Sequence, residues 1–78
     1  MYSDSYRKNT KTYDVLRHME ENVGITSMEA FELYGATRLS AIIFNLRGDG
    51  IPITAIDRVV RDRHDNIVHF AEYRIVKE

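Results

Sequence analysis

The residues on either side of Gly35 constrain the fold of this chain more than any other part of it. Before it, Thr26 is followed three residues later by Glu29, the spacing of a capping box, in which each side chain bonds the backbone amide of the other residue. Gly35 can adopt the left-handed backbone that ends a helix, and Thr37 is a suitable N-cap for the next one. Two short helices joined by so tight a turn are typical of a helix-turn-helix.

The segment that follows this turn has a clear helical period. Four aliphatic residues recur three or four positions apart and predict one buried stripe on a helix at residues 38–47: Leu39, Ile42, Ile43 and Leu46. The second helix of a helix-turn-helix enters the DNA major groove, where Asn can bond adenine and Arg can bond guanine or phosphate. The candidate DNA contacts on its outer face are therefore Arg38, Ser40, Ala41, Asn45 and Arg47. An ordinary solvated face would show the same residue types.

The chain before this motif predicts one further helix and an N-terminal arm. Residues 10–22 carry apolar side chains at helical spacing, and Gly24 ends the pattern. Ile25 is expected to form a strand of one or two residues. Residues 1–9 are polar and mostly without period, so they predict a flexible arm, and a frayed terminus is its simplest interpretation. The alternative is an arm like that of a homeodomain, whose basic side chains reach phosphate or the minor groove: Arg7, Lys8 and Lys11.

Two runs near the C-terminus, residues 56–63 and 67–76, predict the strands of a hairpin. The connecting His-Asp-Asn sequence consists of residues that tolerate turn and left-handed backbone. In the second strand, the apolar side chains change parity between Phe70 and Tyr73. This change predicts a bulge near residues 71–72.

Three helices followed by a hairpin form the winged helix-turn-helix arrangement, an α+β fold, and we expect residues 10–78 to make one such domain. In that arrangement the tip of the hairpin, the wing, lies beside the second helix of the motif and touches DNA. The tip adds three candidate DNA contacts, with Asn66 next to them: Arg61, Arg63 and His64. Arginines that keep a hairpin soluble are the alternative interpretation.

Four segments of the chain together resemble a family of small phage and prophage helix-turn-helix proteins: residues 15–19, 24–30, 35–41 and 45–47. Members of that family pair a Gly-Ile-Thr-Ser entry to the second helix with a Thr-Arg-Leu-Ser start to the third. The resemblance covers about residues 10–53 and, more loosely, the hairpin. It implies a winged helix-turn-helix fold and a DNA-binding role.

The chain departs from this family in two places. Gly48 and Asp49 stand where members tend to continue with basic residues, and Ile43 and Phe44 make the third helix more apolar than groove reading requires. Phe44 is expected to pack under the hairpin, in preference to a protein interface or contact with a thymine methyl group.

The balance of charge argues against DNA binding. The chain has 11 basic and 12 acidic residues and a formal net charge of −1, whereas an isolated DNA-binding domain is typically basic. The acidic residues gather on the first two predicted helices, and the basic ones on the third helix and the hairpin. We therefore expect a bipolar molecule whose one positive face binds phosphate weakly, so that a homodimer or a protein partner would be needed.

Other classes of function lack their residue patterns. The chain has no Cys, which leaves no disulfide or thiolate metal site and suggests an intracellular protein. No apolar run is long enough to span a membrane, the three His lie on different predicted elements, and no nucleophile or phosphate-loop motif is present. We therefore expect no enzyme activity, cofactor, metal or small-molecule substrate, no membrane partner, and a cytoplasmic location.

Two functions fit these patterns. The first is a protein of phage or prophage type that binds double-stranded DNA, as a transcriptional regulator or a DNA-recombination accessory factor. The second is a winged-helix module that binds another protein instead. The Thr-Arg-Leu-Ser start of the third helix and the basic tip favour the first, and the charge balance, Asp49 and Phe44 favour the second.

Overall fold

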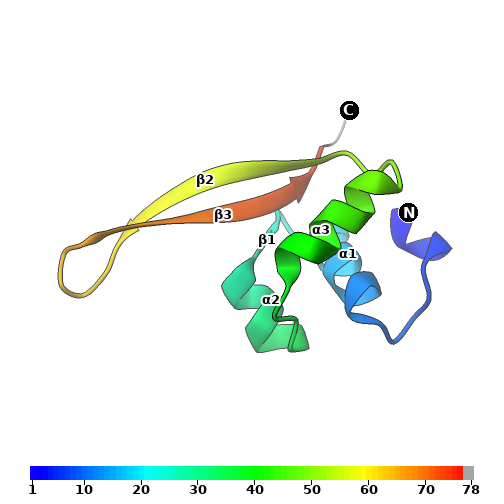
Figure 1. Ribbon diagram of the computed structural model, residues 1–78, viewed down its shortest axis with the longest axis horizontal. Helices are drawn as coiled ribbons and strands as arrows, with labels where there is room; N and C mark the ends of the chain where they lie inside the picture. The colour runs from blue at the N-terminus through cyan, green and yellow to red at the C-terminus, as the bar shows by residue number, and fades with distance from the viewer. Residues whose placement is uncertain (77–78) are drawn as a thin grey trace.

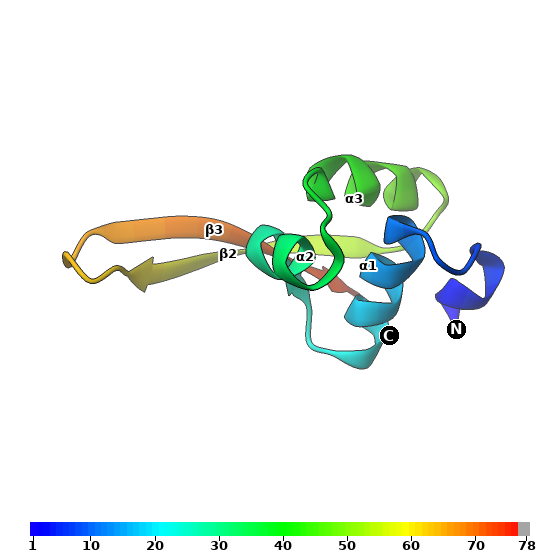
Figure 2. The ribbon, with the colours of Figure 1, turned by 90° about the horizontal axis from the view of Figure 1, so that it is seen from below.

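The computed structural model describes residues 1–76 and has the predicted α+β order of helices followed by a hairpin (Figure 1). The elements described in that range are, in chain order, the 3-10 helix η1 (Tyr2–Ser5), α1 (Lys11–Glu21), β1 (Ile25–Thr26), α2 (Ser27–Tyr34), α3 (Leu39–Gly48), β2 (Ile53–Arg61) and β3 (Ile67–Ile75). The short strand expected at Ile25 is therefore confirmed. The hairpin extends well beyond the helices, as the view in Figure 2 also shows.

The ends of α2 follow the predicted local rules. The Glu29 amide donates to Thr26 Oγ1 over 3.2 Å, and the Thr26 amide donates to Glu29 Oε1 over 3.0 Å, so the capping box is confirmed. Gly35 ends the helix with a φ of 66°, in the left-handed region. The α2 helix is therefore fixed at both ends by interactions within ten residues of sequence.

The start of α3 differs from the prediction. Thr37 is not its N-cap; Arg38 is, with a backbone φ of −125°, and no side chain caps the helix. The Arg38 carbonyl accepts from the amides of Ala41 and Ile42, over 3.2 and 3.3 Å, so the first helical turn begins one residue later than expected. The helix accordingly spans Leu39–Gly48 instead of residues 38–47.

The core lies where α1 and α3 meet the base of the sheet. It contains buried side chains from each of these elements and from the segments between them: Val15, Leu16, Met19, Ile25, Ala30, Ala36, Leu39, Ile43, Leu46, Ile51 and Ile53. His18 of α1 is also buried, and its Nδ1 lies 2.8 Å from the Tyr34 hydroxyl, which connects α1 to α2. Ile42, expected in the buried stripe, is only partly buried.

The sheet is antiparallel with the strand order β1-β3-β2. Its β2–β3 register runs unbroken from Ile53 opposite Ile75 to Arg61 opposite Ile67, so the predicted bulge near residues 71–72 is wrong. The change of parity has another cause, because the hairpin carries apolar side chains on both faces. Tyr73 and Ile75 lie on the face that packs against the core, whereas Val68 and Phe70 lie on the other face and stay partly exposed.

Glu72 stands on this second face and is nearly buried because ion pairs hold it. Its Oε1 accepts from Arg74 Nε over 2.7 Å and from Arg58 over 3.2 Å. The hydrogen bond from Arg74, with the positive charges of Arg74 and Arg58, lowers the pKa of Glu72. This cluster fixes the middle of the hairpin to its root, next to β1.

The first nine residues differ from the expected flexible arm. Helix η1 packs against α1, and its Ser3 is buried with a relative exposure of 1%. The Tyr6 hydroxyl donates to Asp49 Oδ2 over 2.7 Å, and this bond raises the pKa of Tyr6 to about 12. The segment is therefore attached to the domain as far as Tyr6, while residues 7–9 are exposed.

Candidate nucleic-acid interface

The outer face of α3 carries the first group of candidate residues. Its buried face consists of Leu39, Ile43 and Leu46, which leaves the opposite side to solvent. The five candidates predicted on this helix are all exposed: Arg38, Ser40, Ala41, Asn45 and Arg47. The helical period alone accounts for this placement, because residues between the buried positions of a helix turn outward.

Phe44 lies in the middle of this outer face and is 67% exposed. The expectation that it packs under the hairpin is therefore wrong. The contact between α3 and the hairpin is made instead by Arg47, whose guanidinium carbon lies 5.9 Å from the centre of the Tyr73 ring. Phe44 therefore gives the centre of this polar face an apolar contact surface.

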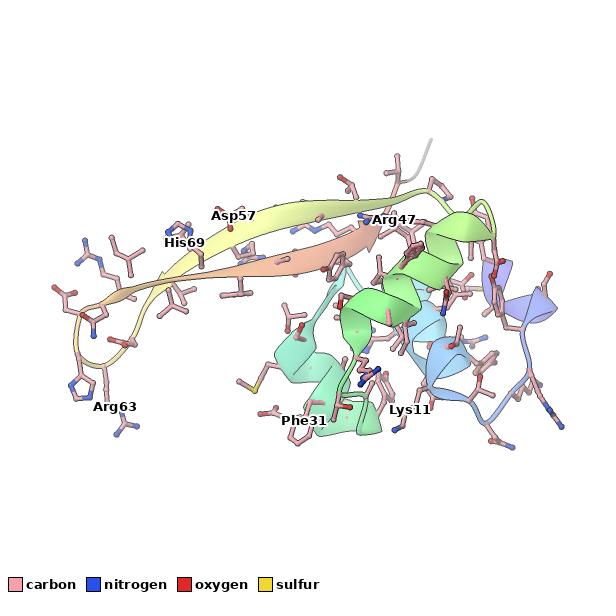
Figure 3. The ribbon with its side chains drawn as sticks, viewed as in Figure 1. Lys11, Phe31, Arg47, Asp57, Arg63 and His69 are labelled. Carbon is pink, nitrogen blue, oxygen red and sulfur yellow. The ribbon has the colours of Figure 1, made fainter. Side chains whose placement is uncertain are left out.

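Arg47 connects the last turn of α3 to the root of the hairpin. Besides its contact with Tyr73, its Nε donates to the Ile53 carbonyl over 3.2 Å. A cation placed over an aromatic ring stabilises the contact by about 0.5–1 kcal/mol at exposed sites. Arg47 thus positions α3 relative to the sheet (Figure 3), a role that the sequence pattern did not indicate.

The tip of the hairpin carries the second group, and Asp62 organises it. Asp62 Oδ1 accepts from the amides of His64 and Asn66, over 2.8 and 2.9 Å, and these bonds lower the pKa of Asp62. Asp65 adopts a left-handed backbone with a φ of 63°. The loop therefore has a defined shape that exposes Arg63 and His64 at its apex. In the sequence, the role of Asp62 in the loop is indicated by its position two and four residues before the residues whose amides it binds.

Carboxylates of the chain itself accompany several basic groups of the hairpin. Arg61 pairs with Asp65 over 2.8 Å, Arg58 pairs with Glu72, and His69 Nδ1 lies 3.3 Å from Asp57. Within residues 1–76, Arg63 has no such ion-pair partner. In that range, Arg63 therefore provides an unpaired positive charge at the apex of the tip, and Figure 3 shows this residue at the far end of the hairpin.

A family model described as winged helix-turn-helix domain matches residues 10–78. The chain belongs to this family. The predicted fold class is thereby confirmed, with α2 and α3 as the helix-turn-helix and with β2, β3 and the loop between them as the wing. Comparison with curated proteins and with solved structures finds no match.

The winged helix-turn-helix domain separates the two candidate groups in space. The molecule is 43 Å along its longest axis, and the wing runs along that axis away from α3 (Figure 1). The contacts made by α3 and those made by the wing tip would therefore involve different parts of one bound ligand. Domains of this kind are typically DNA-binding modules without catalytic activity.

Metal and membrane sites receive no support from the described residues. Within residues 1–76, no three His, Asp or Glu side chains come together in a way that could hold a metal ion. None of the helices in that range combines the length and the apolar character needed to cross a bilayer.

Proposed function

We propose that this winged helix-turn-helix domain binds double-stranded DNA, with α3 in the major groove and the tip of the wing on the backbone. In its finer detail, we propose a cytoplasmic transcriptional regulator or DNA-recombination accessory factor of phage or prophage type. The observation that supports it is the outer face of α3, where the exposed side chains around Phe44 are small or able to bond bases and phosphates.

Each candidate on α3 has a role that follows from its size and chemistry. Ser40 and Ala41 allow the helix to approach the base edges closely, and Asn45 can bond adenine with both the oxygen and the nitrogen of its side-chain amide. Arg38 stands at the first turn, where no side chain caps the backbone amides. Uncapped amides and an arginine together favour a phosphate at this end of the helix.

The wing would contact the backbone through Arg63 and His64 at its apex, with Arg61 beside them. Arg61 and Arg58 already form ion pairs, with Asp65 and Glu72. We therefore expect one copy of the chain to neutralise only about four phosphates. The logarithm of affinity then falls with the logarithm of salt concentration at a slope of about −3.6. Affinity should accordingly fall about 150-fold between 50 and 200 mM salt.

A fluorescence-anisotropy titration of a random-sequence duplex over this salt range tests the proposal. Replacing Arg38 and Arg63 together with alanine should abolish binding, since each stands on one of the two contact surfaces. Arg17→Ala is the control for loss of an arginine away from both surfaces, because it removes one positive charge from α1, where Arg17 pairs with Glu21 over 3.1 Å. An absence of binding by the wild-type chain at 50 mM salt would contradict the proposal.

A second function, binding to another protein, is favoured by the 67% exposure of Phe44. The same titration separates the two functions. Phe44→Ala leaves phosphate contacts unchanged, so it should reduce DNA affinity only if the ring contacts a thymine methyl group or the sugar edge.

A further inference from the structure

The outer edge of β2 presents unpaired backbone groups to solvent. The even-numbered residues of the strand direct their backbone N–H and C=O groups toward β3. Two bonds just outside its ends show this pattern: the Val76 amide donates to the Pro52 carbonyl over 2.7 Å, and the Asp62 amide donates to the Asn66 carbonyl over 3.0 Å. Because antiparallel strands alternate in this respect, the odd-numbered residues direct theirs away from the sheet. Among the described residues, only the Ile53 carbonyl has a partner there, the Arg47 side chain.

This edge has only part of the usual protection against pairing. Exposed edge strands normally carry charged side chains, Lys above all, or Pro or a bulge that discourages a further strand. Strand β2 contains neither Lys nor Pro and its register is unbroken, so its protection is limited to the charges of Asp57, Arg58 and Arg61. Val59 and Val60, near its tip, are 55% and 43% exposed. The edge is thus a long, regular and partly apolar template for another strand.

The opposite edge of the wing is less open. Strand β1 pairs with β3 at Tyr73 and Glu72, and the first turn of α2 lies next to the residues of β3 that precede this pair. Thr26, Ser27 and Met28 line an apolar groove there together with Val60, Val68 and Phe70, so this groove covers the even-numbered face of the wing. No element lies beside the outer half of β2 in Figure 1. Within residues 1–76, β2 lacks a neighbouring strand along its whole outer side, whereas β1 already occupies part of the β3 edge.

We propose that β2 pairs with β2 of a second copy of this chain, antiparallel and with Val59 opposite Val59 on the two-fold axis. In this register Asp57 faces Arg61 of the second copy, and Arg61 faces its Asp57. Asp57 and Arg61 are exposed, 69% and 64%, and belong to residues whose backbone groups point outward. Their partners within the hairpin, His69 and Asp65, are exposed as well, so pairing of two copies exchanges one exposed ion pair for another. The charge pattern of the strand is therefore complementary to itself.

Neighbouring registers are less favourable. Centring the axis on Arg58 or on Asp57 places like charges opposite each other, which destabilises a strand pair. Centring it on Val60 pairs Asp57 with Arg63 and Arg58 with Asp62, but β2 ends at Arg61. Only the Val59 register keeps both ion pairs within the strands.

The paired wings form one four-stranded sheet whose tips point in opposite directions. Five residues of edge bury less surface than the roughly 1,000 Å² typical of a stable interface, so we expect a dissociation constant on the order of 10–100 μM. Pairing would place two α3 helices on one particle. The consequence for DNA binding, and that consequence alone, rests on the proposed function. Self-association itself is independent of DNA.

The absence of Cys from the chain allows a direct test by cross-linking. In a hydrogen-bonded antiparallel pair the facing Cα atoms lie about 5.5 Å apart, so Val59→Cys should give a covalent dimer with a short bismaleimide. Thr54→Cys is the matched control on the same strand, because its two copies would lie roughly 33 Å apart. Equal cross-linking of both variants, or none for Val59→Cys at 200 μM protein, overturns the proposal.

Charge exchange tests the register. Sedimentation of the full chain without DNA should show that Asp57→Arg and Arg61→Asp each weaken the dimer about tenfold, since each places like charges at both pairs. The double variant should restore the wild-type dissociation constant, and it would not do so if the axis lay at Val60. A monomeric wild type, or dimers unaffected by single changes, refutes the pairing. Loss of DNA binding with an intact dimer refutes only the proposed function.

Discussion

Replacing Gly24 with alanine tests how closely the segment after α1 packs against the sheet. A Cβ atom at this position would lie 2.7 Å from the Tyr73 carbonyl oxygen and 2.8 Å from Arg74 Cγ. The first of these neighbours is backbone, and Tyr73 pairs with Ile25, the residue next to Gly24. The strand therefore has to move before the methyl group fits.

The size of the effect follows from that movement. Ordinary van der Waals contact begins at 3.4 Å, so β1 and β3 must separate by about 0.7 Å. Overpacking of this kind costs about 1–3 kcal/mol, and the lower chain entropy of unfolded alanine offsets under 1 kcal/mol of it. For a domain of this size, a net loss near 1.5 kcal/mol lowers the melting temperature by about 6–12 °C.

Thermal unfolding followed by circular dichroism measures this loss, with two other glycines as controls. Gly48→Ala, in α3 with nothing within 4 Å, should raise stability by about 0.5–1 kcal/mol. Gly35→Ala also meets no neighbour, but its φ of 66° makes alanine unfavourable by about 1 kcal/mol. A Gly24→Ala variant as stable as the wild type would refute the close approach of these strands.

Three further substitutions have defined outcomes. Glu72→Gln should lower stability at pH 7 by about 1–2 kcal/mol. Because Arg74 lowers the pKa of Glu72, the stabilisation by this carboxylate is present above the ordinary carboxyl pKa and is lost as the pH falls through the lowered pKa. The urea midpoints of the wild type and the variant should therefore converge in acid. Thr26→Ala removes the α2 cap and should cost about 1 kcal/mol in urea unfolding, with unchanged stability as the contrary result. Tyr34→Phe removes the 2.8 Å bond to buried His18 and should cost about 1 kcal/mol by the same measurement.

Interactions close in sequence account for what could be predicted from the chain. The capping box at Thr26 and Glu29 and the left-handed Gly35 depend on residues a few positions apart, and the structure shows all of them. Gly24 was expected only to end a helix, yet the helix ends at Glu21. The actual constraint on Gly24 comes from β3, almost fifty residues later, and no local pattern carries that information.

The wing shows a second limit of sequence patterns. Alternation identifies a strand with one buried face, but the part of this wing beyond the core has apolar residues on both faces. Val59 and Ile67 share one face, and Val60 and Val68 share the other. A mixed pattern of this kind looks like a shift of register, which explains the incorrect bulge. Exposure of the DNA-contact candidates on α3 was predictable from helical period alone, whereas the exposure of Phe44 depended on where the wing lies.

The charge balance connects the remaining proposals. Carboxylates within the chain occupy Arg58 and Arg61, and Arg47 is engaged at the root of the wing, so one copy has few cations left for phosphate. A single copy would therefore give a salt slope near −3.6, whereas a dimer that places both α3 helices on one duplex would give about −7. The slope thus counts the copies on DNA. A slope that stays near −3.6 above the dimer dissociation constant would mean that paired wings hold the second α3 helix away from the duplex.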